Sequence, residues 1–293
     1  MADAAVKERV REFYDSIGWK EIGDGVYQNA RYEDLRPVAR EYIHRCHLRV
    51  LRHLHPEGRY MLDAGSGPIQ YPEYLTYSEG YQYRVCMDIS IRAIQEARQR
   101  IGKHGLFVVG DLANLPFAEG VFGGIVSLHT IHHLPLSEHK QAYVGLYRVL
   151  EPDGRSVIVS SWAGHSPLMR FMSPFIRLAF GVLKAYRRIR GRQDRIALHE
   201  GELHPEAETL LKRQGTFTAT HNYRWVRREL AFLPGLDVRV WRSVSSSFLR
   251  AFIHQRLMGR FLLMLLYEIE EVAPRFLGRI GQYPMILFYK PPQ

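Results

Sequence analysis

Short apolar runs that end in polar residues alternate with helical stretches in the first half of the chain, and this alternation restricts the fold more than any other feature. Five runs lie at residues 60–64, 84–87, 106–109, 124–128 and 156–160. Helical periodicity fits between several of them, notably at residues 91–101 and 137–150. Repeated strand–helix alternation predicts right-handed crossovers and a parallel sheet that is covered by helices on both faces.

The alternation stops after Trp162 and resumes with apolar runs at residues 238–244 and 285–289. We therefore expect an α/β, Rossmann-like fold with a seven-stranded, mostly parallel sheet and a helical cap insertion. Helical patterns also cover residues 5–20 and 37–55. The predicted parts are an N-terminal helical lid at 1–56, a cofactor-binding core at 57–162, a basic helical cap at 163–235 and a C-terminal completion of the sheet at 236–293.

Polar residues close the first four apolar runs. They are Asp63, followed by Gly65 and Gly67, then Asp88, Asp111 and His129. In open parallel sheets, ligands bind beyond the carboxyl ends of the strands at the point where the strand order reverses. The sequence therefore predicts that these residues converge at one edge of the sheet and form a ligand site there.

The segment Met61–Gly67, which reads MLDAGSG, resembles the first motif of class I S-adenosylmethionine-dependent methyltransferases of the small-molecule and lipid type. The resemblance covers roughly residues 60–162, and it implies S-adenosylmethionine as the cofactor. It implies a cofactor site that contains Tyr14, Asp63, Ala64, Gly65, Ser66, Gly67, Asp88, Ile89, Asp111, Leu112 and His129. In this arrangement Gly65 and Gly67 contact the methionine part of the cofactor, and Asp63 binds its amino group. Asp88 binds the ribose hydroxyls. Asp111 and Leu112 contact the adenine.

Two departures bear on this interpretation. Many relatives have Phe-Asp before the fourth strand, where this chain has Phe122 and Gly123, and the change is expected to loosen the entry to that strand. A dinucleotide fingerprint requires a third glycine three residues after Gly67, but Gln70 stands there. The position of Gln70 argues against an NAD-dependent dehydrogenase.

His132 and His133 leave the fourth strand at the expected catalytic edge, and we take them as candidate general bases. The alternative is that they pack structurally beneath the cofactor loop. The segment 13–19 (FYDSIGW) resembles the lid of small-molecule and lipid methyltransferases. That resemblance places Tyr14 over the cofactor and Trp19 on the acceptor side, whereas a plain amphipathic helix is the competing interpretation.

Excess positive charge lies in the second part of the chain, because residues 163–293 hold 21 of 40 Lys and Arg residues but 10 of 30 Asp and Glu residues. Residues 168–195 also carry many large apolar side chains, and residues 256–269 form a second strongly apolar helix that is too short to span a bilayer. A basic, apolar helix can lie at an anionic membrane surface, but both segments could instead form a buried cap over the active site. No motif for base methylation follows the fourth strand, so a nucleic-acid partner is not expected.

The main hypothesis is O-methylation of a hydrophobic, lipid-linked or sugar-bearing small molecule. Two alternatives are a secondary-metabolite O-, N- or C-methyltransferase and a non-catalytic membrane-binding module on the same fold. The two cysteines have no metal-ligand spacing, and no metal site is expected. We expect a cytoplasmic location, with peripheral association at a membrane, and the sequence leaves the oligomeric state open.

Overall fold

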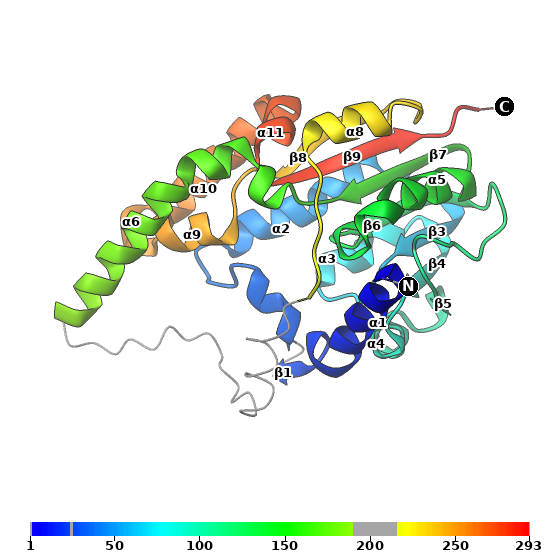
Figure 1. Ribbon diagram of the computed structural model, residues 1–293, viewed down its shortest axis with the longest axis horizontal. Coiled ribbons are helices and arrows are strands. Elements are labelled where there is room, and N and C mark those ends of the chain that lie inside the picture. Colours follow the sequence, from blue (N-terminus) through cyan, green and yellow to red (C-terminus); the bar gives the residue numbers. More distant parts are fainter. Residues whose placement is uncertain (1, 24–25, 190–215, 293) are drawn as a thin grey trace.

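The computed structural model describes residues 2–23, 26–189 and 216–292 (Figure 1). Its centre is a seven-stranded sheet in the order β5-β4-β3-β6-β7-β9-β8. The strands are β3 (Gly58–Ala64), β4 (Tyr81–Asp88), β5 (Gly105–Val109), β6 (Phe122–Leu128), β7 (Leu150–Val159), β8 (Asp237–Arg242) and β9 (Tyr283–Tyr289). The first five strands run parallel, and β9 is antiparallel to both its neighbours. The predicted Rossmann-like, mostly parallel sheet is therefore confirmed.

The strand order reverses between β3 and β6, and this reversal positions the site. From β3 the chain moves outward to β4 and β5, and it then returns to pair β6 with the other side of β3. The two connections leave in opposite directions, which creates a crevice at the carboxyl ends of these strands. The polar residues that close the strands therefore meet at this crevice.

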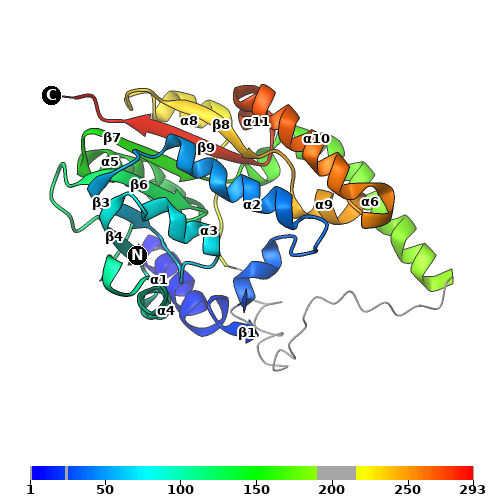
Figure 2. The same cartoon turned by 180° about the vertical axis from the view of Figure 1, so that it is seen from behind.

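Helices cover both faces of the sheet, as Figures 1 and 2 show from opposite sides. On one face, α2 (Arg40–Leu48), α3 (Pro72–Leu75), α4 (Ile91–Ile101), α9 (Ser246–Phe252) and α10 (Gly259–Val272) contribute buried side chains to one apolar cluster. On the other face, α5 (His139–Val149) and α8 (Tyr223–Glu229) contribute to a second cluster. Neighbouring residues of β9 enter opposite clusters, Met285 the first and Ile286 the second, because successive strand side chains point to opposite faces.

The entry to β6 is filled rather than loosened. The ring of Tyr81 packs over Gly124, where a Cβ atom would lie 2.2 Å from the Tyr81 hydroxyl oxygen. The same hydroxyl donates a hydrogen bond of 2.8 Å to the carbonyl of His55. An aromatic ring from β4, which is separated from β6 by β3, therefore fills the space beside Gly124.

Strand β7 begins before the apolar run that was predicted at residues 156–160. Leu150 already pairs with Phe122, and pairing then resumes between Arg155 and Gly124. The intervening residues form a bulge in which Asp153 has a φ of +63°. The strand therefore begins six residues earlier than the apolar run suggested.

The N-terminal segment lies across the crevice end of the sheet. Helix α1 (Ala2–Phe13) continues into a π-helical turn at Tyr14–Gly18, and a short hairpin of β1 (Glu21–Gly23) and β2 (Val26–Tyr27) follows. Its apolar residues form a small third cluster against Ala93 of α4. The predicted segment 1–56 is therefore divided, because the part up to Glu33 contributes residues to the crevice, whereas α2 packs on one face of the sheet.

Helices α6 (Pro167–Ile189), α9 and α10 lie together beyond one end of the sheet, while α11 (Pro274–Ile280) lies near β8 (Figures 1 and 2). Helix α6 extends away from the sheet. None of the described helices is long and apolar enough to cross a membrane. Of the predicted basic run 168–195, residues 190–195 lie outside the described residues, as do the side chains of Arg187 and Arg188.

Candidate active site

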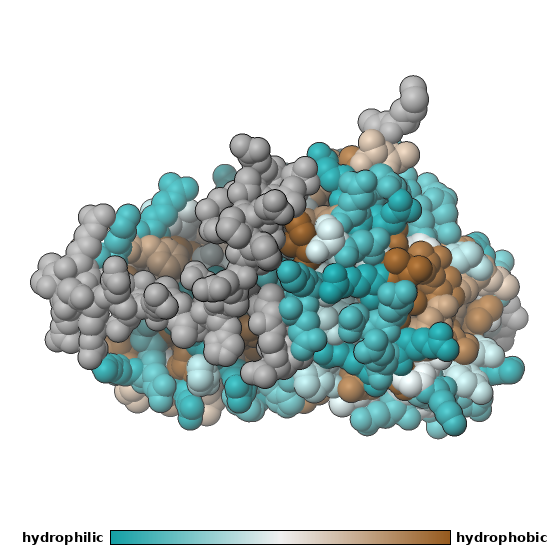
Figure 3. All heavy atoms as spheres, turned by 90° about the horizontal axis from the view of Figure 1, so that it is seen from below, coloured by the Kyte–Doolittle hydropathy of each residue, from teal (hydrophilic) through white to brown (hydrophobic). Residues whose placement is uncertain are grey.

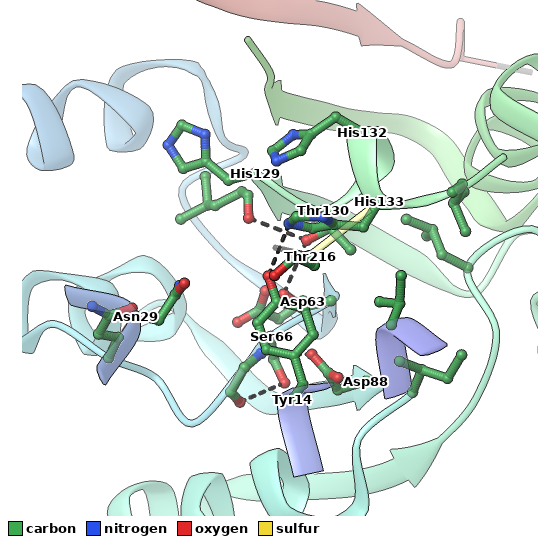
Figure 4. Close-up of a pocket in the computed structure, with 18 of the residues that line it drawn as sticks. Tyr14, Asn29, Asp63, Ser66, Asp88, His129, Thr130, His132, His133 and Thr216 are labelled. Carbon is green, nitrogen blue, oxygen red and sulfur yellow. Dashed lines mark hydrogen bonds between the residues drawn. The ribbon is translucent and has the colours of Figure 1, made fainter. Parts of the chain in front are cut away.

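A cavity of about 500 Å³ opens at the carboxyl ends of β3, β4 and β6 (Figure 4). Among the residues predicted from the sequence, those that line it are Tyr14, Trp19, Asp63, Gly65, Ser66, Gly67, Asp88, Ile89, Asp111, Leu112, His129, His132 and His133. Ala64 is fully buried and does not line the cavity. The fold therefore brings together side chains from five separate segments of the chain.

The glycine-rich loop has a backbone that only glycine adopts easily, with φ values of +78° at Gly65 and +55° at Gly67. A Cβ atom on Gly65 would lie 2.1 Å from Thr130 Cγ2, and one on Gly67 would lie 3.0 Å from the ring of Trp19. The Gly65 amide donates a hydrogen bond of 2.7 Å to the carbonyl of Met87. These glycines therefore allow the protein's own segments to pack around the loop, in addition to any approach by a ligand.

Asp88 ends β4 with its carboxylate buried in the cavity wall. One oxygen accepts a 2.9 Å hydrogen bond from the Gly67 amide, and the other accepts a 2.9 Å hydrogen bond from the Ser90 amide. Burial raises the pKa of Asp88 to about 6, although these two amides oppose the rise. Each carboxylate oxygen keeps a lone pair that could accept a hydrogen bond from a vicinal diol.

Asp63 ends β3 and is held by Arg84, a partner that the sequence pattern did not reveal. The Arg84 Nε donates to Asp63 Oδ2 at 3.1 Å, and the Arg84 Nη2 donates to the same oxygen. Burial raises the pKa of Asp63, while the charge of Arg84 opposes the shift. Because Asp63 Oδ1 makes no hydrogen bond within the described residues, this oxygen is left to hold a ligand's amino group.

Asp111 is bound to the N-terminal helix. Its Oδ2 accepts a 2.6 Å hydrogen bond from Lys7 Nζ of α1, and Lys7 Nζ also lies 2.6 Å from Glu138. Its Oδ1 accepts a hydrogen bond from the Ala113 amide. The carboxylate is thus fixed beside Leu112 at the cavity wall, and α1 is tied across this end of the cavity.

Tyr14 and His133 form a bridge over the cavity. His133 Nδ1 lies 2.8 Å from the Phe217 carbonyl oxygen, which can only accept, so Nδ1 carries the proton. Consequently His133 Nε2 is the acceptor, and the Tyr14 hydroxyl donates to it at 2.8 Å. Burial lowers the pKa of His133 to about 4. Both nitrogens of His133 are therefore occupied by protein groups, which fits a positioning role better than the predicted role of general base.

His129 and His132 lie at the other end of the cavity, with ring centroids 6.3 Å apart (Figure 4). Burial lowers the pKa of His129 to about 4 and that of His132 well below its usual value. The Nδ1 atom of His132 is buried without a hydrogen-bond partner among the described residues. Burial consequently holds both rings in the neutral form, in which one ring nitrogen of each can accept a hydrogen bond from a bound molecule.

Several lining residues were not identified from the sequence, and they come from segments far apart in the chain. They are Asn29, Tyr32, Glu33, Tyr71, Tyr74, Thr216, Thr218, Arg242 and Tyr283. Thr216 and Thr218 belong to the expected cap at 163–235, but no residue of α6 lines the cavity. The expectation that α6 and α10 cover the active site is therefore wrong for the described residues. No local sequence pattern marks these positions, since they meet only in the folded chain.

Residues 62–158, from β3 to β7, match the family described as methyltransferase domain. The chain is also similar to phosphoethanolamine N-methyltransferase 2 of Haemonchus contortus in complex with S-adenosyl-L-methionine, with 15% identity, a TM-score of 0.54, and coverage of 96% of this chain and 60% of that chain. A second similar structure is geranyl diphosphate C-methyltransferase from Streptomyces coelicolor A3(2) with Mg²⁺, geranyl diphosphate and S-adenosyl-L-homocysteine, with 14% identity, a TM-score of 0.53, and coverage of 97% of each chain.

Residues 62–158 of this chain therefore form a methyltransferase domain. The two structural likenesses concern the fold alone. The chain covers 33% and 60% of the lengths of two Haemonchus contortus phosphoethanolamine N-methyltransferases. No curated protein sequence matches it well enough to count as a relative.

The cavity has groups whose chemistry fits S-adenosylmethionine. The glycine loop leaves space that a Cβ atom would fill, Asp88 offers acceptors for ribose hydroxyls, and Asp63 Oδ1 offers one for an amino group. The sulfonium group supplies an electrophilic methyl when the cofactor is bound. Within residues 2–23, 26–189 and 216–292, no three His, Cys, Asp or Glu side chains are grouped to hold a metal ion.

Proposed function

We propose that this methyltransferase transfers the methyl group to an oxygen of a small acceptor that has a large apolar or sugar-bearing part. The observation that carries the proposal is the continuity of the cavity. It runs from Asp88 and Asp111, the proposed cofactor end, to His129, His132 and Tyr283 at the opposite end. Aromatic rings and hydroxyl groups dominate that second end, which suits an uncharged organic molecule.

The chemistry requires alignment and removal of one proton. Holding acceptor and methyl group in line can contribute roughly 7–11 kcal/mol to lowering the barrier. As the acceptor oxygen takes the methyl group, its proton passes to the neutral ring of His132, and S-adenosylhomocysteine leaves. General-base help of this kind is worth about 10²–10⁴-fold. We assign the base to His132, since its ring lines the cavity and its Nδ1 has no partner within the described residues.

We also propose that the acceptor is presented at an anionic membrane surface. On α6, a face of apolar side chains is exposed, including Phe171 (65% exposed), Phe175 and Leu178 (67% exposed). The described part of α6 carries Arg170, Arg177 and Lys184 and has no acidic residue. Exposed apolar side chains on α10, such as Phe261 and Leu265, lie at the same end of the molecule. Figure 3 shows the whole molecule from below, with hydrophobic residues among hydrophilic ones at its left-hand end.

The first experiment follows methyl transfer from isotopically labelled S-adenosylmethionine into a fractionated cell extract. We expect label in the organic-soluble fraction, carried as an O-methyl group identified by mass spectrometry. His132→Ala should lower this turnover by at least 10²-fold while the affinity for S-adenosylhomocysteine remains unchanged. Label in RNA alone would overturn the acceptor class. Label confined to water-soluble metabolites would favour the secondary-metabolite alternative.

The second experiment measures co-sedimentation with vesicles that contain phosphatidylserine. The triple variant Phe171→Ser, Phe175→Ser and Leu178→Ser should bind at least tenfold more weakly than the parent protein. A matched control changes Leu106, Val144 and Phe232 to serine, because these exposed apolar residues lie outside α6 and α10. Equal binding of both triple variants would contradict the membrane proposal. If the first triple variant converts a dimer to a monomer without altering vesicle binding, the face is an interface between two copies.

A further inference from the structure

At the acceptor end, the cavity wall contains a buried ion pair that the transfer step does not use. Glu33 follows the 3₁₀ turn Gln28–Tyr32, and Arg242 is the last residue of β8. The Arg242 Nη1 donates to Glu33 Oε1. Both residues line the cavity, and the Arg242 side chain is 3% exposed. Two segments more than 200 positions apart therefore place opposite charges side by side in the wall.

Two further ionisable side chains, His47 and Glu73, extend this ion pair into a row of alternating charge. Glu33 Oε2 lies 3.6 Å from His47 Nε2, and His47 Nδ1 lies 3.5 Å from Glu73 Oε2. Burial by itself would lower the pKa of His47, but the two nearby carboxylates outweigh that effect and raise it. The row Arg242, Glu33, His47 and Glu73 is therefore close to neutral when His47 is protonated.

Arg242 also has an unused donor. Its Nε is buried without a hydrogen-bond partner among the described residues. Its guanidinium carbon lies 4.6 Å from the centre of the Tyr283 ring, and the His129 ring centre lies 5.5 Å from the same ring. An unpaired buried N–H is costly, so a ligand oxygen at this position would be favourable. The wall thus offers a donor from Arg242, an acceptor from Glu33, and aromatic surfaces on either side.

We infer that Glu33 and Arg242 select an acceptor whose polar group is uncharged and both donates and accepts hydrogen bonds, such as a hydroxyl of a phenol or a sugar. An anion would approach Arg242 only beside the charge of Glu33, and a cation would approach Glu33 only beside that of Arg242. A charged group also loses its hydration in the cavity and finds no unpaired counter-charge there. A neutral hydroxyl avoids both penalties. This inference rests on the proposed function, because it concerns the acceptor end of the same cavity.

The test compares three probes of nearly equal size, namely benzyl alcohol, benzoate and benzylamine. Their binding is measured by ligand-observed NMR on the full chain saturated with S-adenosylhomocysteine at pH 7.5. The wild-type protein should bind benzyl alcohol at least tenfold more tightly than either charged probe. Tighter binding of benzoate or benzylamine by the wild-type protein would overturn the inference, and this comparison needs no variant that might misfold.

Two substitutions then separate selection by charge from general packing. Glu33→Gln removes the negative charge, so benzoate should gain at least tenfold in affinity. Arg242→Gln removes the positive charge, so benzylamine should gain at least tenfold. Loss of affinity for all three probes, with folding confirmed by circular dichroism, would show a structural role only and would overturn the inference. The affinity of the wild-type protein for S-adenosylhomocysteine is measured separately. If the wild-type protein does not bind this molecule, the proposed function is contradicted, whereas the inferred acceptor preference is not.

Discussion

Asp88 shows how one residue serves the fold and the site together. Its two carboxylate oxygens fix the amides of Gly67 and Ser90, so it connects the glycine loop to the start of α4. The same oxygens face the cavity where a ribose would lie. Because burial raises the pKa of Asp88 to about 6, its ionisation falls within the range of ordinary assays.

Asp88→Asn should weaken binding of S-adenosylmethionine by about 1.5–3 kcal/mol, since it removes a charged hydrogen-bond acceptor. In the wild-type protein the affinity should also fall as the pH drops below 6, because protonation of Asp88 removes the same charge. His129 and His133, with pKa values near 4, remain neutral through this window. Calorimetric titration from pH 5 to 8 checks both points. If the Asp88→Asn variant kept the wild-type pH dependence, the ionisation would belong to another group.

Gly65→Ala should lower the melting temperature more than Gly120→Ala. Both glycines have positive φ, at +78° and +67°, so both substitutions add backbone strain. Only at Gly65 does the new methyl group also meet the side chain of Thr130, whereas nothing lies within 4 Å of it at Gly120. Thermal melts monitored by circular dichroism measure the difference. Equal losses would mean that Thr130 moves aside at little cost.

At the scale of elements, α1 acts as a closing segment that is attached at two points. Lys7 connects it to Asp111 and Glu138, and Tyr14 connects the π-helical turn to His133. The second connection extends through His133 to the Phe217 carbonyl. Two separate parts of the chain, around Tyr14 and Phe217, are thereby joined above the cofactor end of the cavity.

Lys7→Met should accelerate dissociation of S-adenosylhomocysteine. A partly buried ion pair of this kind contributes about 1 kcal/mol, which corresponds to roughly a fivefold change. Arg9→Met is the control, because Arg9 is exposed on the same helix. Stopped-flow fluorescence of Trp19, which stacks on Tyr14 with ring centres 5.0 Å apart, measures the rate. An equal acceleration by the Arg9 substitution would show that the general charge of α1 matters, and not the connection to Asp111.

At the scale of the whole molecule, the buried neutral histidines couple stability to pH. Burial lowers the pKa of His129 and His133 to about 4, below the value of about 6.5 in an unfolded chain. A lowered folded-state pKa means that the unfolded chain binds protons first, so stability is lost as the pH falls from 6.5 toward 4. Asp88, with its raised pKa, acts in the opposite direction.

The free energy of unfolding should therefore fall between pH 7.5 and 5, by up to about 1.4 kcal/mol per pH unit for each such histidine below pH 6.5. Urea titrations at several pH values measure it. His133→Gln should reduce this dependence, because glutamine can donate to Phe217 and accept from Tyr14 without titrating. Stability that rises on acidification would mean that Asp88 and other buried acids outweigh the histidines.

The sheet, and the residues at the proposed cofactor end of the cavity, follow from local patterns in the sequence. Strand and helix periods follow from local alternation of apolar and polar residues, and polar residues at strand ends meet at one edge because parallel strands share their direction. Asp88, Asp111 and the glycines were therefore predictable from their places in the chain. The resemblance predicted a place for Tyr14 at the cavity, where it lies, but it did not predict the hydrogen bond to His133.

The residues at the proposed acceptor end, and the hydrogen-bond partners of the histidines, depend on contacts that form only in the folded chain. Glu33 and Arg242 form a pair because β8 joins the sheet next to β9 and the turn before Glu33 reaches across the crevice. Arg84 binds Asp63 from the neighbouring strand, and the Phe217 carbonyl fixes the tautomer of His133. These contacts join residues distant in sequence, and the interaction energies depend on burial and mutual geometry. Local sequence patterns contain no information on burial or on the mutual geometry of distant residues, because both arise only when the chain folds.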